Sequence, residues 1–204
     1  NHGPGNTRNE GLDMATGDYV TFMDHDDWQD LTKYEKMMAK AIEHDADIVF
    51  SNAQEYDQSN GHLNRYYYVP PKIFMGGGFS YIDSPYKKEK LYSLLFPPWA
   101  KIVKRAIIKS KGVRFSESDN KFDDVLFHYH VCTFAKRVYY IDEILSTHRF
   151  FPASISGKAK TNGDMYFDLF KTWDDLVAVC KKHNLPEGEV FVYYIKTLSN
   201  FLYA

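Results

Sequence analysis

The residues best suited to chemistry are the acids of the segment Asp24-His25-Asp26-Asp27. Asp24 and Asp26 lie a dipeptide apart, so their carboxylates can share one hard divalent cation and leave positions for phosphate oxygens and water. Such a site suits a diphosphate group. A solvated turn that caps a following helix would also favour these acids, because helix N-termini attract negative side chains. Both interpretations stay open on these residues alone.

A calcium loop is a further interpretation of the same segment. Four acids fall at positions 1, 3, 7 and 12 of the EF-hand pattern, namely Asp24, Asp26, Asp30 and Glu35. However, Gln29 stands where the pattern requires glycine, and Trp28 occupies a ligand position. A strand, not a helix, is also predicted before the loop. These departures argue against an EF-hand.

The elements that must position the acids predict an α/β fold. The β-rich run Tyr19–Met23 stops directly before Asp24, and ligands of open α/β sheets bind at the carboxyl ends of the strands. Asp30 or Thr32 can cap a helix with apolar residues at helical spacing. Asp47–Ser51 then predicts a second strand, which completes a strand–helix–strand unit.

Farther along the chain, residues 52–84 have an irregular aromatic pattern that ends in Gly76-Gly77-Gly78 and indicates a hairpin or a mobile loop. Short strands are predicted at Val138–Ile141 and Ile144–Arg149. Helical periodicity marks five stretches, which are Lys88–Leu95, Trp99–Ile108, Lys121–Phe134, Met165–His183 and Glu187–Tyr203.

The composition is that of a folded chain of one to one and a half domains. Of the 204 residues, 44% are hydrophobic and 25% are charged. A net charge of −2 creates no field that would collect nucleic acid, so we expect no nucleic-acid partner. Cys132 and Cys180 are too few for a disulfide framework. No run approaches the roughly 18 apolar residues that a membrane span needs.

Three blocks of the sequence carry a family resemblance. The first contains Arg8-Asn9, Gly11, Ala15, Gly17, Tyr19-Val20, Phe22 and Asp24-His25-Asp26-Asp27. The second contains Pro98-Trp99, Lys101, Lys104-Arg105, Val113-Arg114-Phe115 and Phe122-Asp123-Asp124. The third contains His148-Arg149 and Ser154-Ile155-Ser156. Together they resemble the family 2 glycosyltransferases over about residues 1–156.

The resemblance implies the GT-A fold, a Rossmann-like α/β sheet, and transfer of a sugar from a nucleotide-diphospho-sugar to a glycan or lipid-linked acceptor with inversion. We expect residues 1–156 to form the C-terminal part of that catalytic core and residues 157–204 a helical extension. The family's first strands, which bind the base and ribose, have no counterpart before Asn1. The chain is therefore expected to be a fragment of a longer enzyme and not a competent catalyst by itself.

The resemblance also assigns acids to the donor side of the site. Asp24 is expected beside the ribose or the donor sugar. Asp24 and Asp26 are expected to hold Mn²⁺ or Mg²⁺ against the diphosphate of the donor, for which a UDP-sugar is the expected choice. Asp27 would support these two acids or meet the sugar.

Three basic residues are expected to complete the donor side by the same resemblance. Arg8 would point to the nucleotide or to the acidic cluster. His148 or Arg149 would close over the diphosphate, although the family usually has an aromatic residue at the position of His148. Alternatively, Arg8 forms an ion pair at the surface, and His148 and Arg149 are polar residues at the end of a strand.

Asp124 matches the aspartate that acts in the family as general base on the acceptor hydroxyl. In-line attack with inversion needs one such carboxylate and no enzyme nucleophile. Asp123 stands where the family often has glutamate, so some ambiguity between the two acids remains, and capping of the helix N-terminus is the alternative for both. His128 follows Asp124 by four residues and could tune its proton affinity or be a core histidine.

The segment from Lys87 to Arg114 holds nine basic residues and one acid. Because apolar residues are interleaved with these basic ones, one interpretation is a contact with anionic lipid headgroups or with an anionic acceptor. The other interpretation is that the lysines are solvated on two amphipathic helices. We expect a cytoplasmic protein that contacts the inner face of the membrane peripherally. A non-catalytic sugar-nucleotide or glycan-binding module on the same fold is the rival hypothesis.

Overall fold

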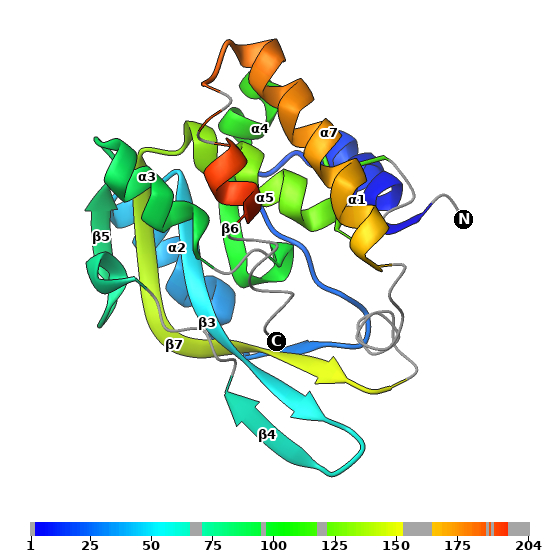
Figure 1. Cartoon of the computed structure of the whole chain (residues 1–204). Coiled ribbons are helices and arrows are strands. Elements are labelled where there is room, and N and C mark those ends of the chain that lie inside the picture. Colours follow the sequence, from blue (N-terminus) through cyan, green and yellow to red (C-terminus); the bar gives the residue numbers. More distant parts are fainter. Residues whose placement is uncertain are drawn as a thin grey trace.

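The computed structural model describes residues 3–65, 71–94, 97–117, 122–152, 165–186, 188 and 190–195, and Figure 1 shows how the elements are arranged. The helices are α1 (Gly3–Met14), α2 (Lys33–Glu43), α3 (Pro85–Tyr92), α4 (Arg105–Lys111), α5 (Asp123–Phe134) and α7 (Met165–His183), with 3-10 turns η1 (Lys72–Phe74) and η2 (Pro98–Ala100). The strands are β1 (Tyr19–Val20), β2 (Trp28–Gln29), β3 (Ile48–Asp57), β4 (His62–Arg65), β5 (Gly78–Tyr81), β6 (Lys101–Lys104) and β7 (Arg137–Phe150).

Within these described ranges, seven strands form one mixed sheet with the central order β1-β6-β3-β7-β2. The long strands β3 and β7 run parallel, with Ile48 beside Val138 at one end and Asp57 beside Phe150 at the other. The remaining pairs are antiparallel, including β4 on β3 and β5 on β7. The predicted α/β class, with a partial sheet and helices, is confirmed.

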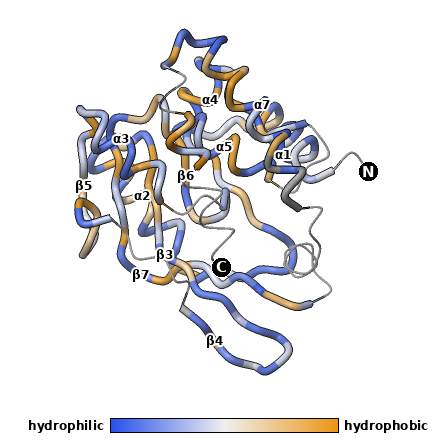
Figure 2. Tube along the Cα trace, in the orientation of Figure 1, coloured by the Kyte–Doolittle hydropathy of each residue, from blue (hydrophilic) through white to orange (hydrophobic). Residues whose placement is uncertain are grey.

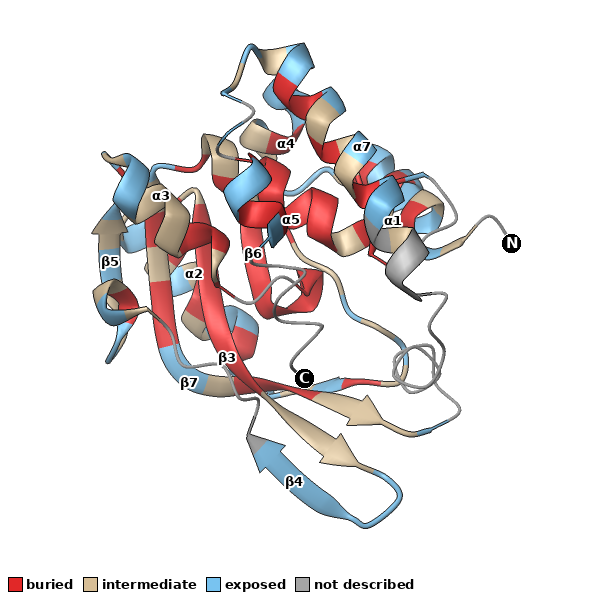
Figure 3. Cartoon of the chain, viewed as in Figure 1, coloured by how far each residue is buried: buried red, intermediate tan, exposed pale blue. Residues whose placement is uncertain are grey.

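The sheet separates two cores because successive residues of a strand point to opposite faces. Val103 of β6 packs in the larger core with Phe127 of α5, whereas its neighbour Ile102 packs in the smaller core with Met37 of α2. Figure 1 accordingly shows α2 on one side of the sheet and α1, α5 and α7 on the other. Figure 3 shows α5 and β6 among the most buried elements.

The β3–β4 hairpin lies outside both cores. Residues 54–57 are half-buried and residues 58–64 are exposed, and Figure 2 shows this arm as largely hydrophilic. Its turn is built by Asp57, whose Oδ1 accepts from the backbone N–H of Ser59 at 2.8 Å, and by Gly61 at φ 73°. The hairpin predicted within residues 52–84 is therefore present.

The predicted helix over Trp99–Ile108 is wrong in its first half. Residues 98–100 form the turn η2, Lys101–Lys104 form β6, and only then does α4 begin at Arg105. The pair Ile102-Val103 can pack one β-branched side chain on each face of the sheet between β1 and β3, which favours a strand over a helix.

Two predicted strand boundaries also differ. The first strand ends at Val20 and not at Met23, because Thr21 leaves the ladder and its hydroxyl donates to the Lys101 carbonyl at 2.9 Å. The two short strands predicted between Val138 and Arg149 are one strand, β7. Its pairing with β3 shifts register between Ser51 and Ala53, and this irregularity interrupts the alternation that the sequence shows.

Helix α2 begins as predicted after Thr32, which occupies the N-cap position. The Thr32 side chain makes no capping bond. Instead, Asp30 Oδ1 accepts from the Thr32 backbone N–H at 2.8 Å and from its hydroxyl at 2.5 Å. Met37 and Ala41 are buried against the sheet, whereas Ile42 of the expected apolar face is exposed.

At the C-terminal end, α7 matches the predicted helix over Met165–His183, and its Leu176 and Cys180 pack in the larger core. Of the helix predicted over Glu187–Tyr203, residues 188 and 190–195 are helical and the rest lies outside the described residues. The predicted boundary between residues 156 and 157 also lies outside them, so the division into core and extension stays a prediction. Among the described helices, none has the length and apolar character needed to cross a membrane.

Candidate functional site

The acidic loop lies between β1 and β2. A backbone bond from the Asp27 N–H to the Asp24 carbonyl at 3.2 Å closes it into a turn. Asp27 is buried, and its Oδ1 accepts from the backbone N–H of Arg149 at 2.9 Å. Asp24 and Asp26 are half-buried. The loop is thus fixed at its Asp27 end and keeps two adjacent carboxylates accessible.

Arg8 connects this loop to the N-terminus of α5. Its guanidinium donates to Asp24 Oδ1 at 2.9 Å and to Asp123 Oδ2 at 2.7 Å, and it lies over the Phe115 ring at 5.6 Å from the centroid. Desolvation opposes the charge of Arg8, but the carboxylates of Asp123 and Asp24 prevail and raise its pKa. Arg8 thus contacts the acidic cluster, and its contact with a nucleotide stays a prediction.

The two acids that open α5 have different surroundings. Asp123 is buried and is held by Arg8. Asp124 Oδ1 is also enclosed, yet it has no hydrogen-bond partner among the described residues. Desolvation and the neighbouring Asp123 carboxylate raise the pKa of Asp124 to about 7. Asp124 as a whole is half-buried, and a carboxyl group with one enclosed, unpartnered oxygen and a pKa raised toward neutrality has properties that suit a general base.

His148 and Arg149 lie near the end of β7, close to the acidic loop. The His148 ring stacks on Trp99 with centroids 6.1 Å apart and planes 7° apart, and its Nδ1 lies 3.6 Å from Glu55 Oε2. The backbone of Arg149 holds Asp27, as described above. The structure therefore brings the third sequence block to the first, while leaving the chemical role of both side chains a prediction.

Two fully buried lysines were missed as site residues by sequence reasoning. Lys33 Nζ donates to the Trp99 carbonyl at 2.6 Å and to Ser146 Oγ at 2.8 Å, and Lys101 Nζ donates to the Pro97 carbonyl at 2.8 Å. Desolvation lowers the pKa of Lys33 to about 8 and that of Lys101 to about 7. The sequence could have indicated that Lys33 is buried, because Lys33 precedes the buried Met37 by one helical turn and therefore lies on the same face of α2.

The histidines of α5 lie in the core. His128 is fully buried and its Nε2 contacts the Tyr92 carbonyl at 3.2 Å, and desolvation lowers its pKa. His130 Nε2 faces His183 Nε2 of α7 at 3.3 Å. The core interpretation of His128 is therefore the one that its surroundings support.

The calcium-loop interpretation finds no support in the geometry. Asp30 is engaged with Thr32, and its backbone N–H donates to the Leu145 carbonyl at 3.1 Å. Trp28, at a ligand position of the pattern, forms β2 with its ring partly exposed. No group of three or more potential metal ligands occurs within the described part of the chain.

The acids of the loop nevertheless fit a hard cation that is completed by a substrate. Asp24 and Asp26 supply carboxylate oxygens, the ligand type that Mg²⁺ and Mn²⁺ prefer, and Mg²⁺ sites commonly take one or two protein carboxylates plus phosphate and water. Asp27 Oδ2 is buried without a partner among the described residues, so the same loop contains a further carboxyl oxygen that makes no hydrogen bond there.

The basic segment between Lys87 and Arg114 is not one free surface. Most of its side chains have internal partners: Lys87 with Asp83, Lys88 with the carbonyls that end α5, Lys90 with Glu89, Lys101 with Pro97, Lys104 with Asp45, Arg105 with Gly17, and Arg114 with Asp13. Because of these contacts, much of the positive charge of residues 87–114 is not available on one common surface.

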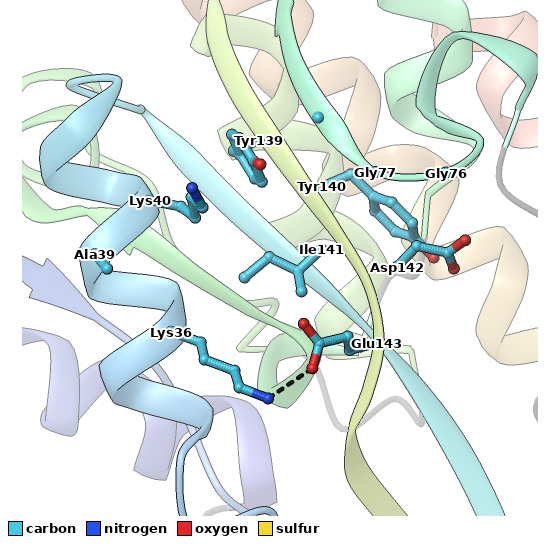
Figure 4. A pocket seen from close by; sticks show the side chains of 11 residues that line it. Lys36, Ala39, Lys40, Gly76, Gly77, Tyr139, Tyr140, Ile141, Asp142 and Glu143 are labelled. Atoms are coloured by element: carbon cyan, nitrogen blue, oxygen red, sulfur yellow. Dashed lines mark hydrogen bonds and ion pairs between the residues drawn. The ribbon is translucent and has the colours of Figure 1, made fainter.

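A pocket lies elsewhere, around the irregular part of β7. It is lined by α2 and the glycine segment 76–78, and Figure 4 shows Lys36 reaching Glu143, with an Nζ–Oε2 distance of 2.6 Å. None of the predicted site residues lines this pocket. It is therefore separate from the cluster of Arg8 and the acids.

Comparison with known proteins decides the family. The family model described as "Glycosyl transferase family 2" matches residues 1–142, which include the acidic loop and both acids of α5. The chain belongs to glycosyl transferase family 2. The resemblance seen in the sequence blocks is thereby confirmed.

Relatives within family 2 include two proteins of Streptococcus pneumoniae serotype 4. "Glycosyltransferase GlyG" is 24% identical over 205 residues, which cover 98% of this chain and 65% of the relative. "Glycosyltransferase GlyA" is 28% identical over 162 residues, which cover 76% of this chain and 22% of the relative. The chain thus spans less than two thirds of either protein.

Solved structures give the same fold. The crystal structure of S. aureus TarS 1-349 in complex with UDP-GlcNAc superposes with a TM-score of 0.64 at 22% identity, covering 86% of this chain and 47% of that chain. Because the likeness covers most of this chain, the GT-A fold expected for a family 2 chain is confirmed. At this identity it concerns the fold and not the substrate.

Proposed function

We propose that the site of this family 2 chain transfers a sugar from a nucleotide-diphospho-sugar to a glycan or lipid-linked acceptor, with inversion and with Asp124 as general base. One observation carries the proposal. Arg8 joins Asp24 of the acidic loop to Asp123 through bonds of 2.9 and 2.7 Å, and the next residue, Asp124, has an enclosed Oδ1 without a partner among the described residues and a pKa raised to about 7.

On the donor side, Asp24 and Asp26 would hold Mn²⁺ or Mg²⁺, and Asp27 would keep the loop in shape through its bond to the Arg149 backbone. A bound cation of this kind supplies positive charge that neutralises the departing diphosphate. UDP is the expected nucleotide, and the UDP-GlcNAc complex of the similarly folded TarS supports testing it first. His148 and Arg149 would contribute positive charge at the same side.

On the acceptor side, Asp124 fits the base better than Asp123. Asp123 already gives an oxygen to Arg8, whereas Asp124 Oδ1 is without a partner among the described residues. In the proposed step the acceptor hydroxyl oxygen bonds to the anomeric carbon and its proton passes to Asp124. The bond from that carbon to the diphosphate oxygen breaks, and its electron pair leaves with the nucleoside diphosphate. No covalent enzyme intermediate is needed.

The cellular location of the reaction is a further part of the proposal. A cytoplasmic location with a peripheral contact between residues 87–114 and anionic lipid stays a prediction, and the internal partners of most basic side chains there reduce the charge available for it. In this proposal the donor side is formed by Asp24, Asp26 and Asp27 of the acidic loop, Arg8 of α1, and His148 and Arg149 of β7.

The test is calorimetric titration with UDP in the presence of Mn²⁺ of a form of the protein that includes the base- and ribose-binding strands expected before Asn1, with Asp26→Asn as the variant. Asp30→Asn is the matched control, because it removes a nearby acid that follows β2 and is engaged with Thr32, and asparagine can keep that turn. We expect binding that Asp26→Asn abolishes and Asp30→Asn preserves. If UDP, GDP and other nucleoside diphosphates all fail to bind, or if both variants behave alike, the donor-site proposal is wrong.

A further inference from the structure

Lys33 is a fully buried lysine that holds two distant segments together. It lies at the start of α2, and its Nζ donates to the Trp99 carbonyl of η2 at 2.6 Å and to Ser146 Oγ of β7 at 2.8 Å. Burying a charged group costs free energy that an apolar side chain of similar volume would not cost. An apolar side chain, however, cannot fix η2 against β7 through directed bonds.

The two segments that Lys33 joins carry a stacked pair of rings. Trp99 and His148 lie with their ring centroids 6.1 Å apart and their planes 7° apart. Trp99 belongs to η2, and His148 follows Ser146 by two residues on β7, so the side chains of Ser146 and His148 point to the same face of the strand. Lys33 therefore bonds to the backbone of one ring's residue and to the strand that carries the other ring.

This stretch of β7 also fixes the acidic loop. The backbone N–H of Arg149 donates to Asp27 Oδ1 at 2.9 Å, and the Leu145 carbonyl accepts from the backbone N–H of Asp30 at 3.1 Å. Residues 146–148 lie between these two contacts. A displacement of this stretch therefore changes how its histidine lies relative to the carboxylates of the loop.

We propose that Lys33 is a positioning residue of the sugar transfer, which keeps the His148 imidazole at the donor side by fixing η2 against β7. The inference rests on the proposed function, in which His148 contributes positive charge at that side. Lys36 provides the contrast, because it lies three residues later on α2 and its Nζ pairs with the exposed Glu143 at 2.6 Å, as Figure 4 shows.

The first measurement is a ¹H–¹³C NMR spectrum of the histidine rings of the chain, with His148→Ala used to assign the His148 signal. Lys33→Met removes both bonds and keeps an unbranched side chain, and Lys36→Met is the matched control. We expect Lys33→Met to shift the His148 signal, because the Trp99 ring current acts on the stacked imidazole, and Lys36→Met to leave it unchanged. If Lys33→Met does not fold, Ser146→Ala removes one of the two bonds and should shift the same signal.

The second measurement is a double-mutant cycle on UDP binding with Mn²⁺, in the form of the protein that includes the strands expected before Asn1. Lys33→Met and His148→Ala should each weaken binding by about tenfold, and the double variant should bind no more weakly than His148→Ala alone. Such non-additivity is expected if Lys33 acts through His148, whereas independent effects on the scaffold would add. Lys36→Met should bind UDP like the wild type.

An unchanged His148 signal in the folded Lys33→Met or Ser146→Ala variant would overturn the proposal. Additive losses of UDP affinity would do the same, because they would trace the effect of Lys33 to the scaffold and not to His148. An equal effect of Lys36→Met in either measurement would also overturn it. If the wild type does not bind UDP, the proposed function fails, while the NMR comparison needs no nucleotide and still decides whether Lys33 places the His148 ring.

Discussion

The ion-pair bridge of Arg8 offers the sharpest test of how the site is held together. Arg8→Met removes both bonds while keeping much of the apolar stem that lies against Phe115. The Asp123 side chain is 5% exposed and that of Arg8 is 18% exposed, so this bond is a buried pair whose disruption costs about 3–5 kcal/mol. The Asp24 side chain is 35% exposed, and its bond should add at most about 1 kcal/mol.

The loss should depend on pH in a defined direction. Burial already raises the pKa of Asp123 although Arg8 opposes this, and removing Arg8 raises the pKa further. A carboxyl with a raised folded-state pKa binds more protons in the folded than in the unfolded chain, so stability falls as pH increases through that range. Arg8→Met should therefore be more destabilising at pH 8 than at pH 5.5.

Urea unfolding followed by far-UV circular dichroism at both pH values measures this difference. Arg114→Met is the control, because Arg114 also ties α1 to a distant segment but pairs with an exposed Asp13. It should change the free energy of unfolding by less than about 1 kcal/mol at either pH. The reasoning is refuted if Arg8→Met costs no more than Arg114→Met, or if its cost is larger at pH 5.5 than at pH 8.

Two further predictions concern the same region. Gly5→Ala should destabilise the chain by about 1–3 kcal/mol in urea unfolding, because a Cβ at this position would lie 2.1 Å from the Ser116 carbonyl oxygen. Gly11→Ala on the same helix meets open space and should stabilise the chain by up to about 1 kcal/mol. Similar effects of the two substitutions would contradict the close approach of α1 to Ser116. Asp124→Asn should lower the rate of sugar transfer by about 10²–10⁴-fold while UDP binding is retained. The kcat/KM of the wild type should rise as the pH increases through about 7, because the Asp124 carboxyl loses its proton there. An Asp124→Asn variant that keeps full activity would exclude Asp124 as the base.

Much of the site could be predicted from local sequence. The acidic loop, the acids at the start of α5 and the strand–helix–strand unit depend on residue types at short spacing, and short-range hydrogen bonds such as Asp30 to Thr32 follow from neighbours in the chain. The family blocks extend the same information. What the sequence misjudged was the stretch Trp99–Ile108, where a helical period of apolar residues competes with the pairing of β6 between two strands.

The sequence by itself determined the chemistry available to this protein: two adjacent carboxylates in a turn, a second acidic pair at a helix start, and membership of a glycosyltransferase family. The tertiary structure alone decided how these groups act on one another. Arg8 meets Asp123, an aspartate 115 residues away, whereas Asp124 Oδ1 has no hydrogen-bond partner within the described part of the chain, and Lys101 is fully buried. The physical reason is that charge states depend on burial and on distances between groups, and both arise only when distant segments pack together.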